Sequence, residues 1–141
     1  KVYKKKLVNL IERHKLSKKI KFIQHCKEMP LAYSLCDVVV SASIEPEAFG
    51  RISVEAQSMG KPIIASNIGG SKETVINKKT GLLYKHDDPR ELAKNLNTVI
   101  QLSQEELKLM GNEGRKNVTK KFDVDSMCDS NLREYKKLLV K

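Results

Sequence analysis

The sequence predicts an α/β fold, a doubly wound, Rossmann-like parallel sheet covered by helices. Short apolar runs alternate with helical patterns between residues 20 and 84, and this alternation is typical of strand–helix–strand units. The run DVVVS at Asp37–Ser41 is almost continuously apolar, as expected of a strand that is buried on both faces. Gly60-Lys61-Pro62 and Gly69-Gly70 separate the predicted elements, at places where the chain has to turn.

The first half of the chain is predicted to alternate between helices and strands in the following order. Residues 2–15 form an amphipathic helix with lysines between its apolar positions, and IKFIQ at 20–24 forms a short strand. A short helix over 29–36 precedes the strand at 37–41. After a loop, a helix runs over 50–59.

The second half is predicted to begin with a buried strand at 62–66, a short helix at 73–76 and a last strand at 81–84. Asp88-Pro89 opens a helix, with proline in the first turn. Ser103 to Glu106 is a capping box that opens the next helix. The final helix runs from Ser126 to Val140, and its apolar face either covers the core or docks against a further domain. That face consists of Met127, Leu132, Tyr135, Leu138 and Leu139.

Composition restricts the possible function classes. The chain has 141 residues, a net charge of +10 and three scattered cysteines, which read as reduced thiols in a cytoplasmic protein. No stretch of about 18 apolar residues predicts a membrane span. The lysines are spread along the chain without interleaved aromatic residues, which argues against nucleic acid as a partner. One interpretation of this charge is a general lysine-rich drift in composition without function. Its best functional use is peripheral attraction to an anionic membrane at its inner face.

The segment Ser41–Gly50 is the strongest candidate for a binding site. It leaves the carboxyl end of a predicted parallel strand, where ligands of doubly wound sheets bind. It then enters a helix whose first N–H groups lack internal partners and carry partial positive charge. Gly50 has no side chain, so we expect that a phosphate can approach the backbone closely there.

Two glutamates flank this helix start. Ile52, Ala56 and Met59 form the expected apolar stripe, which places Glu55 at the edge of the buried face. A carboxylate there is explained if it accepts hydrogen bonds from ribose hydroxyls, while Glu47 meets a second polyol beyond the phosphate. A nucleotide sugar has this layout. The alternative interpretation is that Glu47 caps the helix and Glu55 extends to solvent.

The run from Glu47 to Val75 resembles family 4 retaining glycosyltransferases. Glu47 and Glu55 fit the E-x7-E signature, and the segment through Ser66, Gly69-Gly70 and Glu73 resembles the same family. The pattern looks most like bacterial enzymes that assemble lipopolysaccharide or other surface polysaccharides. The resemblance implies a GT-B architecture in which residues 1–141 are part of the C-terminal, donor-binding half. The N-terminal acceptor domain is then a missing partner.

The resemblance also implies roles for individual residues. Glu47, the catalytic candidate, holds hydroxyls of the donor sugar, and Glu55 binds the ribose. The turn at Cys26 and Lys27 lines the base. Backbone groups that meet the sugar and the diphosphate belong to Phe49, Gly50, Arg51 and Ile52, and Gly69 and Gly70 let the backbone approach the donor. The donor is a nucleotide diphosphate sugar, and no cofactor or metal is expected.

The sequence departs from the family pattern near its start. The Arg and Lys that grip the diphosphate in the family have no counterpart here, and the first two strands of the domain are lacking. In the strand order 3-2-1-4-5-6, the strand at 20–24 is strand 3. Without strands 1 and 2 it has no neighbour to pair with. Position 1 is lysine, and we expect the chain to belong to a larger protein and to be inactive alone. A non-catalytic remnant, a split-gene fragment and an epimerase-like domain are the alternatives.

Overall fold

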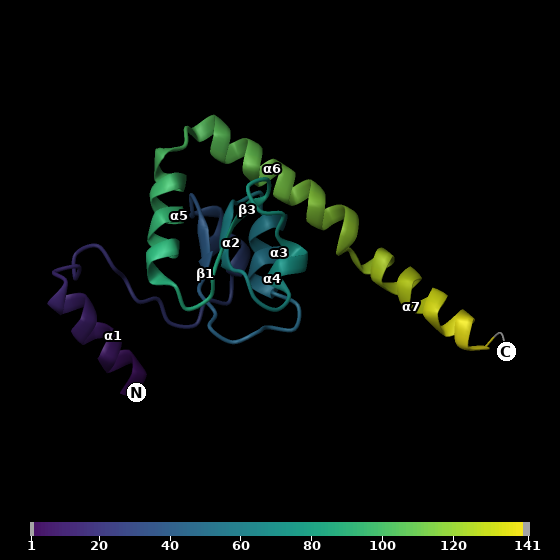
Figure 1. Ribbon diagram of the computed structural model, residues 1–141, viewed down its shortest axis with the longest axis horizontal. Coiled ribbons are helices and arrows are strands. Elements are labelled where there is room, and N and C mark those ends of the chain that lie inside the picture. Colours follow the sequence, from purple (N-terminus) through teal and green to yellow (C-terminus); the bar gives the residue numbers. More distant parts are fainter. Residues whose placement is uncertain (1, 140–141) are drawn as a thin grey trace.

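The structure, a computed structural model, describes residues 2–139 and contains a three-stranded parallel sheet between helices (Figure 1). Strands β1 (Val39–Ser41), β2 (Ile63–Ser66) and β3 (Gly81–Tyr84) pair in the order β1-β2-β3. Val39 lies opposite Ile63, which in turn lies opposite Gly81. The predicted α/β class with a parallel sheet is confirmed.

The helices lie close to the ranges that the sequence predicts. Asp88 caps one of them by accepting hydrogen bonds from the N–H groups of Arg90 and Glu91, and Ser103 forms the expected capping box with Glu106. The seven helices of the described residues are α1 (Val2–Arg13), α2 (Met29–Ser34), α3 (Arg51–Ser58), α4 (Ser71–Thr74), α5 (Pro89–Gln101), α6 (Gln104–Lys121) and α7 (Val124–Leu139).

Each face of the sheet has its own apolar core, because successive strand residues point to opposite faces. Val39, Ile63 and Ala65 pack on one face with residues of α2 and α3. Ile64, Leu82 and Tyr84 pack on the other face against residues of α5 and α6, among them Val99 and Leu107. Helices therefore cover both faces of the three-stranded sheet, as the predicted α/β class requires.

The predicted strand at 20–24 is wrong. The segment is extended but pairs with no strand of the described residues, and Ile23 is 82% exposed. Figure 1 shows α1 and the segment after it lying apart from the sheet. A strand requires a hydrogen-bonding neighbour, and in the order 3-2-1-4-5-6 this segment is separated from β1 by two strands that are not among the described residues.

The buried face of α3 also differs from the predicted stripe. Ser53, Ala56 and Gln57 are buried, whereas Ile52 is exposed. The Gln57 amide reaches across the interface and donates to the carbonyls of Ser53 and Thr74, both at 2.9 Å. These carbonyl groups supply acceptors for the buried amide nitrogen, whereas Gln57 Oε1 has no hydrogen-bond partner among the described residues.

The two edges of the sheet are treated differently. At the β3 edge, the Leu83 N–H donates to Asn77 Oδ1 at 2.9 Å, and Asn95 Nδ2 donates to the Leu83 carbonyl at 3.3 Å. At the β1 edge, the Val39 N–H donates to the carbonyl of Pro62, the residue just before β2. The alternating ladder therefore turns the backbone groups of Val40 away from β2. Side-chain amides cover the β3 edge, whereas no side chain of residues 2–139 hydrogen-bonds to the outward backbone groups of Val40.

Helix α7 does not cover the core. It has no buried residue in the described part, and the predicted apolar face from Met127 to Leu139 is exposed. Figure 1 shows α7 extending away from the sheet beyond α6. Docking against a further domain stays a prediction, and Val140, predicted as the helix end, lies outside the described residues. None of the described helices is long and apolar enough for a membrane span.

The capping box at the start of α6 provides a test of the fold. Ser103 Oγ accepts from the Glu106 N–H at 3.2 Å, and Glu106 Oε2 accepts from the Ser103 N–H at 2.7 Å. We expect Ser103→Ala to lower the free energy of unfolding by about 1 kcal/mol, measured by urea denaturation. Ser130→Ala, at an exposed position inside α7, is the control and should cause no loss. Equal losses in the two variants would contradict the capping role.

Candidate functional site

Two loops meet at the carboxyl ends of β1 and β2. The Gly70 N–H donates to the Glu47 carbonyl at 2.8 Å, which joins the loop after β2 to the loop after β1. A Cβ added at Gly69 would overlap the Glu47 backbone, and one added at Gly70 would overlap the Phe49 carbonyl. The Gly69-Gly70 pair is therefore explained by close packing between the loops, and the Gly70 N–H is occupied by Glu47.

Gly50 is the N-cap of α3 and has a φ of +74°, a conformation that favours glycine. An added Cβ would lie 3.1 Å from the Ser71 nitrogen. A side chain at position 50 would therefore point toward the start of α4. Packing against α4 thus explains why a glycine is found here, without a role in ligand binding. Contact between a phosphate and this part of the backbone stays a prediction.

Glu47 is held by the same loop. The Ser43 hydroxyl donates to Glu47 Oε1 at 2.6 Å, and the Glu47 carbonyl is fixed by Gly70. The carboxylate does not cap α3, because Gly50 occupies the N-cap position and no side chain caps it. The alternative interpretation of Glu47 as a helix cap is therefore wrong.

Glu55 lies at the edge of the buried face of α3, with a side chain that is 36% exposed. The Tyr33 hydroxyl donates to Glu55 Oε2 at 2.8 Å, and Arg51 Nε donates to Oε1 at 3.1 Å. Tyr33 is 5% exposed. Burial and, next, the hydrogen bond to Glu55 raise the pKa of the Tyr33 hydroxyl to about 12. At ordinary pH this hydroxyl is therefore a donor to the carboxylate.

The start of α3 has donors available for an anion. The N–H groups of Ser53 and Val54 both donate to the Gly50 carbonyl. Those of Arg51 and Ile52 have no acceptor among the described residues. Free N–H groups at a helix start, together with the helix dipole, are suited to phosphate oxygens. The Arg51 side chain, 83% exposed, adds a positive charge beside them.

The Phe49 ring projects toward the junction of α6 and α7. It meets the Phe122 ring edge to face, with centroids 5.6 Å apart and an interplanar angle of 78°. A pocket of about 320 Å³ adjoins this pair and is lined by Phe49 and by residues of the junction, including Asp123 and Met127. The loop that carries Glu47 is thus in contact with the last part of the chain.

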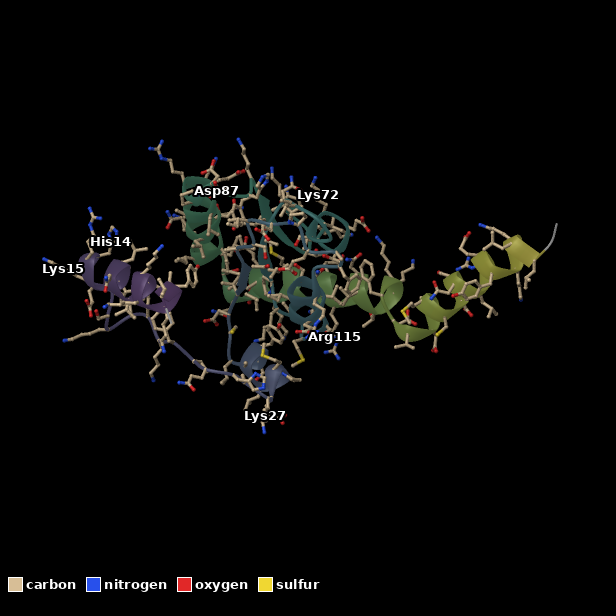
Figure 2. All side chains as sticks on the ribbon, turned by 90° about the horizontal axis from the view of Figure 1, so that it is seen from below. His14, Lys15, Lys27, Lys72, Asp87 and Arg115 are labelled. Atoms are coloured by element: carbon tan, nitrogen blue, oxygen red, sulfur yellow. The ribbon has the colours of Figure 1, made fainter. Side chains whose placement is uncertain are left out.

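The structure gathers most of the predicted site residues at this end of the sheet, and Cys26 and Lys27 lie in the segment before α2. In Figure 2, Lys27 lies beside α2, whereas Lys72 at the start of α4 lies on the opposite side of the molecule. Contact of Cys26 and Lys27 with a base stays a prediction. The residues that come together are Glu47, Phe49, Gly50, Arg51, Ile52, Glu55, Gly69 and Gly70.

Sequence reasoning missed the two hydroxyl donors, Tyr33 and Ser43. Tyr33 is the aromatic residue of a short apolar helix, and a buried tyrosine hydroxyl usually has a hydrogen-bond partner. This signal indicates that a polar group lies nearby, but it does not identify Glu55. Ser43 lies four residues before Glu47, and that spacing is informative only once the loop conformation is known.

Comparison with known proteins gives consistent matches. Residues 1–117 match the family described as glycosyl transferases group 1. A glycosyltransferase from Rickettsia africae superposes on 99% of this chain with a TM-score of 0.90 and 34% identity, and the match covers 37% of that protein. HepE from Anabaena, solved with UDP, superposes on 96% of this chain with a TM-score of 0.90 and 30% identity, over 37% of its own length.

Among curated relatives, the capsular polysaccharide biosynthesis glycosyltransferase CapM of Staphylococcus aureus is 31% identical over 120 residues. That match covers 79% of this chain and 31% of CapM. The matches to curated relatives cover between 18% and 32% of the length of those proteins.

The packing of the two loops is tested by Gly70→Ala. Gly70 has a φ of −61°, so alanine is strained there only by its contact with the Phe49 carbonyl. We expect the free energy of unfolding to fall by about 2 kcal/mol or more. The control is Gly60→Ala, where space is open but φ is +67°, at an expected cost of about 1 kcal/mol. A Gly70→Ala variant that is more stable than the control would contradict the loop contact.

The Tyr33–Glu55 contact predicts a pH dependence. Because the pKa of Tyr33 is about 12 in the folded chain and about 10 when unfolded, the stability it contributes is full below about pH 10. It is lost as the pH rises from about 10 to 12, since the unfolded chain releases its proton first. NMR titration of ring-labelled tyrosine should locate this pKa. Glu55→Gln should lower it only in part, because burial is the largest cause; an unchanged pKa would contradict the contact.

Proposed function

The chain belongs to the group 1 glycosyltransferases, as part of the C-terminal domain of a GT-B fold, and on this premise we propose that it binds a nucleotide diphosphate sugar. The proposal depends on two carboxylates near the start of α3, whose free N–H groups can bind an anion. Glu47 precedes the helix, and Glu55 lies in its second turn. Glu47 and Glu55 are each held by a hydroxyl donor, and the free N–H groups of Arg51 and Ile52 lie between them in the sequence.

The ligand that fits this arrangement has hydroxyls at both ends and phosphates between. Glu55 accepts from the ribose, and the start of α3 with Arg51 takes the diphosphate. Glu47 accepts from hydroxyls of the donor sugar and is the proposed catalytic carboxylate. Anabaena HepE, solved with UDP, supports a nucleotide as the ligand of this fold.

The proposed reaction is transfer of the glycosyl group to a saccharide or lipid-linked acceptor, with retention at the anomeric carbon. Negative charge develops on the departing diphosphate, and donors placed beforehand stabilise it more effectively than reorganising water does. We propose that the N–H groups of Arg51 and Ile52 and the Arg51 guanidinium take this role, without a metal. The acceptor is bound by a further domain, for which the exposed face of α7 is the docking surface.

A role in cell-envelope glycan synthesis, in the cytoplasm and peripheral to the membrane, is the finer part of the proposal. It is supported by the similarity to CapM, whose name places that protein in capsular polysaccharide biosynthesis. The net charge of +10 adds attraction to an anionic membrane surface.

A non-catalytic remnant or split-gene fragment is the second candidate. Such a protein keeps the ribose contact but binds the donor weakly. The two candidates differ in turnover once the rest of the enzyme is supplied, and they agree on the role of Glu55.

Nucleotide binding tests the assignment of Glu55. Ligand-observed NMR with UDP measures weak binding, and Glu55→Ala should weaken it at least about tenfold, because hydrogen bonds to a charged acceptor are lost. Glu134→Ala removes the same charge from an exposed position on α7 and should leave the affinity unchanged. Equal affinity of wild type and Glu55→Ala would overturn the ribose assignment. Binding that depends on salt but not on Glu55 would instead indicate nonspecific polyanion binding.

A further inference from the structure

We propose that Tyr33 is a positioning residue for the donor ribose: its buried hydroxyl holds one oxygen of Glu55 so that the other oxygen faces the ligand. The inference rests on the proposed function, in which Glu55 binds the ribose. It adds a residue from a different helix, outside the segment that contains both glutamates.

Tyr33 is well placed to orient a carboxylate. It lies in α2 and belongs to the core cluster that contains Val39 and Ala56. The ring is therefore fixed by packing, and the direction of its O–H bond is restricted to the Glu55 side. A buried hydroxyl needs a partner, and Glu55 Oε2 at 2.8 Å supplies it. The contact fixes the rotation of the carboxylate relative to the sheet.

The two oxygens of Glu55 are held by unequal partners. Oε2 accepts from the buried Tyr33, whereas Oε1 accepts from Arg51, whose side chain is 83% exposed. Exposed ion pairs contribute little, because water screens them and long side chains lose entropy. Arg51 can therefore leave Oε1 at small cost, and a ribose hydroxyl takes its place.

This exchange links the two parts of the ligand. Arg51 is the first residue of α3, where the diphosphate is proposed to bind. When the ribose displaces its guanidinium from Oε1, the guanidinium becomes available to a phosphate oxygen. Tyr33 stays on Oε2 throughout, so the carboxylate keeps its orientation while its second partner changes.

A purely structural role for Tyr33, as a tie between α2 and α3, makes a different prediction. Loss of such a tie weakens the domain and reduces the affinity for every ligand of the site. Loss of a positioning contact weakens only ligands that bond to the carboxylate. Comparison of UDP with 2′,3′-dideoxyuridine diphosphate, which lacks both ribose hydroxyls, separates the two roles.

The experiment measures both ligands by ligand-observed NMR on the full chain and on Tyr33→Phe. We expect about tenfold weaker binding of UDP, as for loss of a hydrogen bond to a charged group, and unchanged binding of the dideoxy nucleotide. Tyr84→Phe is the matched control, because Tyr84 is another buried tyrosine, 4% exposed, whose pKa is raised by burial. It should bind both ligands as wild type does.

Three results would overturn the inference. Tyr33→Phe binds UDP as tightly as wild type; it loses affinity for both nucleotides equally; or it weakens UDP binding further in a Glu55→Ala background, where no carboxylate is left to position. Failure of the wild-type chain to bind UDP would instead reject the proposed function, and the inference with it. The two failures are therefore distinguishable.

Discussion

The site depends on one contact, the close packing of the loops that follow β1 and β2. Gly69 and Gly70 allow the second loop to lie directly against the backbone of Glu47 and Phe49, and the Gly70 N–H bonds to the Glu47 carbonyl. Gly50 closes the same contact from the other side, against Ser71. Any side chain between these loops would move Glu47 and the start of α3 relative to the sheet. The carboxylates and the helix dipole are therefore positioned by backbone packing.

Two side-chain hydroxyl groups orient the carboxylates that the backbone positions. Ser43 holds Glu47 and Tyr33 holds Glu55, each from outside the segment between the two acids. Neutral donors of this kind orient a carboxylate without cancelling its charge, and the Arg51 guanidinium that also donates to Glu55 is 83% exposed and therefore contributes little. Each glutamate also has spare acceptor capacity, because a carboxylate oxygen has two lone pairs. The glutamates are thus fixed in direction and remain able to bind hydroxyls.

Much of the fold followed from local signals, since capping residues, glycines and buried valine runs act over a few positions. The helix starts at Asp88 and Ser103 and the strand at Val39–Ser41 were predictable for this reason. The strand at 20–24 was not, because pairing depends on a neighbouring strand and not on the segment itself. The candidate site could be proposed from the sequence where it is contiguous, from Glu47 to Glu55. Tyr33 was missed because only the tertiary fold brings α2 to α3.

The two edges of the sheet differ in whether their outward backbone groups are already hydrogen-bonded. Asn77 and Asn95 satisfy the outward backbone groups of Leu83, so adding a strand beside β3 requires that two existing hydrogen bonds be broken. Beside β1, the outward groups of Val40 meet no such side chains in the described residues. Among the described residues, β1 is therefore the edge beside which a further strand can pair without displacing existing side-chain hydrogen bonds.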